Sequence, residues 1–118
     1  MKVNVAEKLD LITRHWETRV VAELNGQHVR LAKLLGTFVW HAHDHEDELF
    51  FVVSGRLKIE FRDRDVWPDP GEMLVVPRGV DHRPVAAEEV AVLLFEPAET
   101  VNTGSADDDR TVADPEWV

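Results

Sequence analysis

The stretch that decides the fold runs from His41 to Gly55 and reads HAHDHEDELFFVVSG. His41 and His43 alternate, and alternate side chains of a β-strand point to the same face. A tight turn over residues 44–47 would bring the next strand back antiparallel, with Glu48 as its first residue. Imidazole nitrogens and carboxylate oxygens are donors that suit Zn, Mn, Fe, Co and Ni. The stretch therefore predicts two strands whose junction presents two histidines and a carboxylate to one ion.

The same stretch has two other interpretations. A run of histidines and acids can also be a solvated polar turn, which by itself needs no metal. His45 could pair with His43 in place of His41, but a set of His43, His45 and Glu48 leaves too short a turn. We therefore expect His45 to lie on the loop, and the metal hypothesis depends on a second segment.

That second segment, GEMLVVPRGVDH, covers residues 71–82. Its first residue closes a PDPG turn, and residues 73–76 are expected to form a short buried strand. Pro77 can end this strand because proline has no N–H to give to a ladder. Gly79 can adopt a positive φ in the turn that swings His82 inward. His82 is therefore the expected fourth ligand, and an ordinary core or surface histidine is the alternative.

Short apolar runs separated by turn signals fill the rest of residues 18–97, as in a β-sandwich or β-barrel. Asn25-Gly26 between two such runs is a strong two-residue hairpin signal. Two runs are apolar on both faces, which suggests strands covered on both sides, for example by a second subunit. About eight strands are expected, at residues 18–24, 27–35, 38–43, 48–53, 56–61, 73–77, 83–86 and 90–95.

The two ends of the chain differ from this β pattern. Residues 4–17 place apolar side chains at helical spacing behind Asn4, a plausible N-cap, and predict a short amphipathic helix. Residues 98–118 form an acidic tail with six carboxylates against Arg110 alone.

Composition narrows the possible partners and the compartment. The formal net charge of -10 disfavours nucleic acid and anionic membranes, which are bound through basic surfaces. Cysteine is absent, so no disulfide or thiolate site can form. The N-terminus lacks an uninterrupted apolar stretch, and no apolar run approaches the ~20 residues that a membrane helix needs. We expect a soluble, cytoplasmic protein.

The two segments together resemble the motifs of the cupin superfamily, and the resemblance extends over nearly the whole chain. The first motif, H-x-H-x4-E-x6-G, matches His41, His43, Glu48 and Gly55. The second, G-x5-P-x-G-x2-H-x3-N, matches Gly71, Pro77, Gly79 and His82. Ala86 replaces its final Asn, and the Gly expected six residues before the first His stands one place closer, at Gly36. Neither departure affects a proposed ligand.

The resemblance implies a single all-β domain over residues 1–118, a small bacterial cupin with a double-stranded β-helix (jelly-roll barrel). The barrel is expected over about residues 18–97, after the N-terminal helix and before the acidic tail. The resemblance also implies one divalent transition metal (Mn, Fe, Ni or Zn) held by His41, His43, Glu48 and His82. We further expect a homodimer, because small cupins usually pair through an outer sheet.

A site of this kind predicts a small-molecule metalloenzyme of dioxygenase, isomerase or decarboxylase type. The alternatives are a noncatalytic small-molecule-binding cupin and a purely structural metal. No catalytic residue is assigned, and the absence of Tyr and Cys excludes mechanisms with a Cys-Tyr crosslink or a Tyr acid. Phe38 and Trp40 are expected on the outer face, and no carboxylate other than Glu48 is expected inside. Alternation predicts an apolar lumen, suited to a partly hydrophobic substrate, with walls from Val39, Phe50, Val52, Met73 and Val75.

Overall fold

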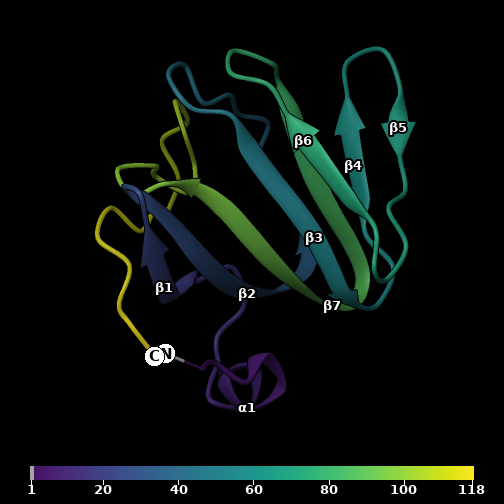
Figure 1. Ribbon diagram of the computed structural model, residues 1–118. Coiled ribbons are helices and arrows are strands. Elements are labelled where there is room, and N and C mark those ends of the chain that lie inside the picture. The colour runs from purple at the N-terminus through teal and green to yellow at the C-terminus, as the bar shows by residue number, and fades with distance from the viewer. Residues whose placement is uncertain (1) are drawn as a thin grey trace.

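The longest strand, β7 (His82–Pro97), organises the sheet because it pairs with three other strands. The computed structural model describes residues 2–118. On one edge, β2 (Gln27–Thr37) follows almost the full length of β7. On the other edge, β4 (Lys58–Phe61) pairs with the first part of β7, and β3 (Glu48–Ser54) pairs with the second part. A strand shared in this way bends the sheet into a barrel (Figure 1).

Three further strands complete the sheet. β1 (Arg19–Leu24) and β6 (Met73–Val76) lie at the ends of the order β1-β2-β7-β3-β6, and β5 (Asp65–Val66) pairs with β4. All of these pairings are antiparallel. The all-β class expected from the sequence is therefore confirmed.

The β1–β2 hairpin confirms the turn read from the sequence. Asn25 and Gly26 have φ values of 51° and 75°. Positive φ at both central residues defines a type I′ turn, whose twist matches that of the flanking strands.

Several predicted boundaries were wrong. Residues 38–43 form no regular strand, because β2 ends at Thr37 and only His41 pairs beyond it, in an isolated bridge to His82. Residues 83–86 and 90–95 belong to the single strand β7. The helix α1 spans Val5–Asp10 rather than residues 4–17, and Trp16 takes a left-handed φ of 69° that no helix contains.

The N-terminal end of α1 agrees with the sequence. The side chain of Asn4 accepts a hydrogen bond from the backbone N–H of Glu7 at 3.0 Å, as an N-cap does. Among residues 2–118, no helix combines the length and apolar character needed to cross a bilayer.

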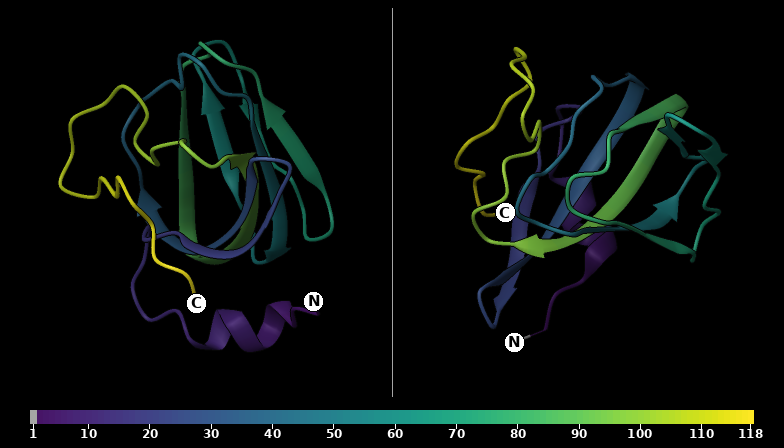
Figure 2. Two further views of the ribbon diagram at one scale, coloured as in Figure 1. Left: turned by 60° about the vertical axis from the view of Figure 1, so that its left-hand side comes forward. Right: turned by 90° about the horizontal axis from the view of Figure 1, so that it is seen from above.

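Two apolar cores lie on opposite faces of the sheet. The inner core fills the barrel with side chains such as Leu34, Phe50 and Val92. The outer core lies between the sheet and α1, where Leu9 and Ile12 are buried with other side chains of the outer face. Figure 2 shows α1 outside the barrel, beneath the curved sheet. The apolar character on both faces of β7 is thus explained in part by α1.

Candidate metal centre

Backbone hydrogen bonds bring the two sequence motifs together at one end of the barrel. His41 and His82 exchange two backbone hydrogen bonds, of 3.0 and 2.9 Å. Gly79 donates its N–H to the carbonyl of His43 at 2.8 Å, and Arg78 donates its N–H to the carboxylate of Asp47 at 2.8 Å. The loop after β2 and the loop before β7 are therefore fixed to each other.

Four side chains converge where these loops meet. Each offers one ligand atom, and these atoms all lie within 4.8 Å of one another. At most 3% of the surface of any of them is exposed. The Nε2 atoms of His43 and His82 lie 3.4 and 3.5 Å from Glu48 Oε1. The four residues that the structure brings together are His41, His43, Glu48 and His82, the set predicted from the sequence.

Two of the three imidazoles are oriented by backbone carbonyls. His41 Nδ1 donates to the carbonyl of Val39 at 2.9 Å, and His82 Nδ1 donates to that of Val80 at 3.0 Å. A histidine whose Nδ1 carries the proton presents the lone pair of Nε2, as a metal ligand requires. The Nδ1 atom of His43 instead lies beside Gly104, without a hydrogen-bond partner among residues 2–118.

The charges of the cluster suit a cation. Burial, and then the neighbouring His82, lower the pKa of His41 to about 4, so the ring is neutral near pH 7. Burial opposes ionisation of Glu48, but the adjacent His43 and His82 rings outweigh it and hold the pKa of this carboxyl well below its usual range. Burial alone would lower the pKa of His43, as it does for His41, but the contact with Glu48 outweighs burial and raises the pKa of His43. The cluster therefore offers a neutral imidazole at His41 and a carboxylate at Glu48.

The hydrogen bonds of the buried polar atoms in the cluster show whether a metal ion fits among them. Within residues 2–118, four polar atoms of the cluster are buried without a partner. Leaving a buried polar group unpaired costs about 1–3 kcal/mol, so native proteins rarely tolerate several together. A divalent ion among them would coordinate three of these atoms, and three imidazoles with one carboxylate form a donor set that transition metals accept. The unpartnered atoms are His43 Nδ1, His43 Nε2, Glu48 Oε1 and His82 Nε2.

Sequence reasoning missed a second buried carboxyl group beside the cluster. Glu96 is 1% exposed, in contrast to the expectation that only Glu48 faces inward. Its Oε1 accepts a hydrogen bond of 2.9 Å from Arg30, which is fully buried. Burial, and then the nearby charge of Glu48, raise the pKa of Glu96 well above its usual range. Alternation along β7 could have revealed this residue, since Glu96 continues the inward stripe of Val92 and Leu94.

A small cavity borders the cluster inside the barrel. The space open to the centres of water molecules is about 30 Å³, and His41 and Glu48 form part of its wall. Most of the remaining wall is apolar, which confirms the expected character of the lumen. Other parts of the wall come from Trp16, Leu34, Phe38, Phe50, Val92 and Leu94.

Some predicted positions around the lumen were wrong. Met73 and Val75 are 61% and 52% exposed on the outer face, because the inward positions of β6 are those of Leu74 and Val76. Phe38 lies inside, 5.4 Å from the ring of His41, rather than on the outer face. The prediction assumed a strand there, and without one the alternation does not hold. Phe50 and Val52 are buried in the barrel core, as expected.

The other histidines lie away from the cluster. His45 is exposed on the loop, as expected. His15 contacts Glu89 at 2.8 Å. His28 contacts Glu23 at 3.2 Å, and its Nδ1 accepts from Arg30.

Comparison with known proteins identifies the family. The model of the cupin domain family matches residues 22–96, which is more than half of the chain. The chain therefore belongs to the cupin superfamily, and its antiparallel barrel is the cupin jelly roll.

Several relatives are similar to this chain. A cupin-2 domain protein of Shewanella frigidimarina is 44% identical, with a TM-score of 0.79 over 80% of this chain and 93% of that one. Protein NMB1881 of Neisseria meningitidis is 32% identical, with a TM-score of 0.76 over 82% of this chain and 99% of that one. The uncharacterized protein YdbB of Bacillus subtilis is 39% identical over 64 residues, which are 53% of this chain and 57% of that protein. The match therefore spans little more than half the length of this curated relative.

Proposed function

We propose that the chain binds one divalent transition metal through His41, His43, Glu48 and His82 and acts on a small molecule beside it. The observation that carries this proposal is the set of converging, buried ligand atoms, three of which have no hydrogen-bond partner among residues 2–118. An ion of Mn, Fe, Ni or Zn bound there would supply Lewis-acid chemistry, and Mn, Fe or Ni could add redox chemistry. Four protein ligands leave coordination positions for water or a substrate.

The surrounding residues support a reaction of dioxygenase or isomerase type. The backbone carbonyls of Val39 and Val80 hold two imidazoles in place. The apolar wall next to His41 excludes bulk water and favours a small, mainly apolar ligand. The chain contains neither Tyr nor Cys, so the metal ligands and their neighbours must carry the chemistry.

Oxygen consumption tests the type of function. Iron(II)-loaded protein would be incubated with a panel of diols, thiols and 1,3-diketones, and a matched zinc-loaded sample would report reactions without redox change. Oxygen uptake with one compound, absent in a His82→Ala variant, is the expected result for a dioxygenase. Product formation by the zinc form without oxygen uptake would indicate an isomerase. Neither reaction with any compound would favour a noncatalytic binding cupin.

We also propose that two copies pair through the outer face of the sheet. Strand register places two apolar rows side by side across β6, β3, β7 and β2. The helix α1 covers only part of this face, and Met73 and Val75 remain more than half exposed. The rows are Val75–Leu49–Phe95–Val29 and Met73–Phe51–Leu93–Leu31.

Size-exclusion chromatography with light scattering tests this pairing. A mass of about twice 13.5 kDa is expected for the parent chain. A double variant, Met73→Lys with Val75→Lys, would place two charges in the interface and give the monomer mass. A parent mass near 13.5 kDa would contradict the dimer.

A further inference from the structure

The C-terminal strap, residues 100–112, runs along one side of the barrel, where it appears yellow-green in Figures 1 and 2. The strap meets the metal cluster directly. The N–H of Ser105 donates to the carbonyl of Ala42 at 3.0 Å, and Gly104 lies against His43. Asn102 forms part of the wall of the small cavity. The strap is thus part of the enclosure of the cavity.

Internal hydrogen bonds give the strap a defined shape. The side chain of Asn102 donates to the carbonyl of Arg110 at 2.8 Å and accepts from the N–H of Val112 at 2.7 Å. The hydroxyls of Thr103 and Thr111 lie 2.6 Å apart. Because these bonds join the two limbs of the strap, we expect the strap to move as a unit.

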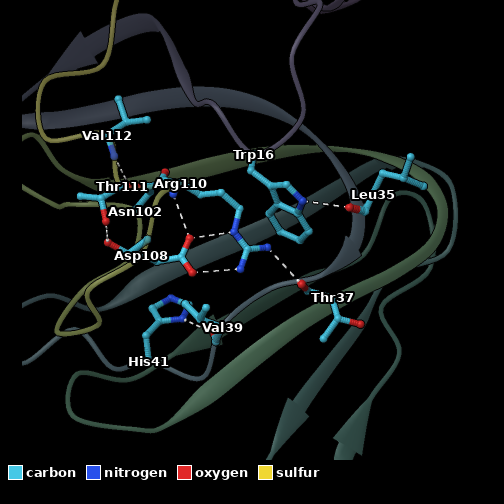
Figure 3. A network of polar contacts seen from close by, with 11 residues as sticks. Trp16, Leu35, Thr37, Val39, His41, Asn102, Asp108, Arg110, Thr111 and Val112 are labelled. Atoms are coloured by element: carbon cyan, nitrogen blue, oxygen red, sulfur yellow. Dashed lines mark hydrogen bonds and ion pairs between the residues drawn. The ribbon is translucent and has the colours of Figure 1, made fainter.

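Arg110 fastens this unit to the barrel (Figure 3). Its guanidinium carbon lies 4.6 Å from the ring centre of Phe38 and 5.8 Å from that of Trp16. Its Nη1 donates to the carbonyl of Thr37 at 3.1 Å. Asp108 accepts from Nε at 2.8 Å and from Nη2 at 3.2 Å, which holds the guanidinium plane over the aromatic rings.

The rings beneath Arg110 lead to the metal cluster. Phe38 stacks on Trp16 at 4.5 Å and meets the ring of His41 edge-on at 5.4 Å. Both aromatic rings border the cavity, as does Asn102 of the strap. A space of about 30 Å³ holds only about two water molecules. A cavity that binds benzene measures about 150 Å³, so an aromatic ligand as large as catechol needs the walls of this cavity to move.

We propose that Arg110 is a specificity-determining residue, which makes the C-terminal strap a size filter for ligands of the metal site. This inference rests on the proposed metal-binding function. Molecules of two or three heavy atoms, such as azide or dioxygen, fit while the strap is fastened. Larger apolar or aromatic molecules bind only after Arg110 leaves Phe38 and Trp16, so the strength of this contact sets their rate of entry.

Cobalt(II)-loaded protein allows the test, because ligands at the ion change its visible absorption. Stopped-flow traces would follow the binding of azide and of catechol to the parent and to Arg110→Gln. The variant should bind catechol about 2- to 30-fold faster, the range that loss of one cation–π contact corresponds to. Its rate with azide should stay unchanged. Asp108→Asn leaves Arg110 in place but removes its partner, and should change the catechol rate in the same direction.

Arg62→Gln is the matched control. Arg62 stacks on Trp40 at 3.8 Å and pairs with Asp81 at 3.0 Å, outside the walls of the cavity. It should bind both probes as the parent does, and circular dichroism should show that all variants are folded. An unchanged catechol rate in Arg110→Gln and Asp108→Asn would overturn the proposal. Equal acceleration of azide and catechol, or no catechol binding to any of the proteins, would also overturn it.

A metal-free measurement separates this inference from the proposed function. Failure of the parent to bind cobalt would contradict the metal site but leave the strap open to test by hydrogen–deuterium exchange. The amide of Ser105 should then exchange faster in Arg110→Gln than in Arg62→Gln. Equal exchange in the two variants would overturn the role of Arg110.

Discussion

Arg30 and the histidine cluster both lie inside the barrel. The guanidinium nitrogens of Arg30 all have hydrogen-bond partners within the chain, whereas several ligand atoms of the histidine cluster have none among residues 2–118. All three guanidinium nitrogens of Arg30 have partners, which include the carboxylate of Glu96 and the carbonyls of Ala98 and Thr100. The ligand atoms of His43 and His82 make no hydrogen bond among residues 2–118 and only approach Glu48 Oε1, at 3.4 and 3.5 Å. The difference teaches that the first group serves stability, because its partners are built in, whereas the second is arranged for a partner from outside.

The largest effect is expected where the contacts are complete. Arg30→Leu would remove the partner of Glu96 Oε1, next to an Oε2 that has no hydrogen-bond partner among residues 2–118, and would remove the donors to two carbonyls. We expect the free energy of unfolding to fall by about 3–5 kcal/mol in urea denaturation. The double variant with Glu96→Leu should recover part of this loss, because no buried carboxyl group is left without its partner, while the carbonyls of Ala98 and Thr100 still lack their donor. A loss below about 1 kcal/mol in the single variant would remove the contrast between the two groups.

A substitution by leucine in the histidine cluster should change the metal-free stability less and should abolish stabilisation by zinc. His82→Leu removes a buried ring that makes one hydrogen bond, from Nδ1 to the carbonyl of Val80, and whose Nε2 makes none, so the metal-free stability should change by less than about 1.5 kcal/mol. Zinc at 100 times its dissociation constant should stabilise the parent by about 2.7 kcal/mol, and the variant not at all. Thermal unfolding with and without zinc measures both quantities. Equal stabilisation of parent and variant by zinc would mean that the ion binds elsewhere.

A glycine comparison tests how closely the strap and the cluster are packed. Gly104 has a φ of 54°, and a Cβ there would overlap the carbonyl oxygen of Ala42 and approach His43. Gly26 also has a positive φ, 75°, but a Cβ there meets nothing within 4 Å. Gly104→Ala should therefore lower the free energy of unfolding by about 1–3 kcal/mol and weaken zinc binding, with a smaller loss in Gly26→Ala. Equal losses in the two variants would mean that the strap moves aside for the added Cβ without a further loss in the free energy of unfolding.

The smallest effect concerns the pH dependence of the strap. Side-chain and backbone hydrogen bonds from Arg110 lower the pKa of Asp108 to about 2, from an ordinary value of 3.8. A carboxyl group with a lowered pKa contributes stability above its ordinary pKa, and the contribution disappears as the pH falls through the folded value. The stability difference between the parent and Asp108→Asn should thus be present at pH 5 and shrink between about pH 4 and pH 2.

Asp109→Asn is the control for this titration, since Asp109 forms no ion pair within residues 2–118. Urea denaturation at a series of pH values compares the two variants. A pH profile shared by both would assign the effect to the general charge of the tail rather than to the Arg110–Asp108 pair.

The sequence allowed the strongest predictions where residue type and spacing act together. Glycine and proline at fixed distances set the turns, and the histidines then converge because both loops are tied through His41 and His82. The Asn25-Gly26 turn was likewise predictable, because few residues tolerate a positive φ.

The features that could not be predicted from the sequence depend on tertiary contacts. Phe38 lies inward because the chain leaves regular β-structure after Thr37, and no local pattern shows where a strand stops early. Alternation places Arg30 and Glu96 on inward stripes, but no local pattern shows that these two residues pair with each other inside the barrel. The role of the tail could not be predicted either, because Arg110 contacts the ring of Phe38, which lies more than 70 positions earlier in the sequence.

The metal content of untagged protein tests the central claim most directly. Elemental analysis of the parent would be compared with a His43→Ala and His82→Ala double variant, after confirming that both are folded. We predict close to one divalent ion per chain in the parent and almost none in the variant. Equal and negligible metal in both proteins, even after incubation with Mn, Fe, Ni or Zn, would contradict the account.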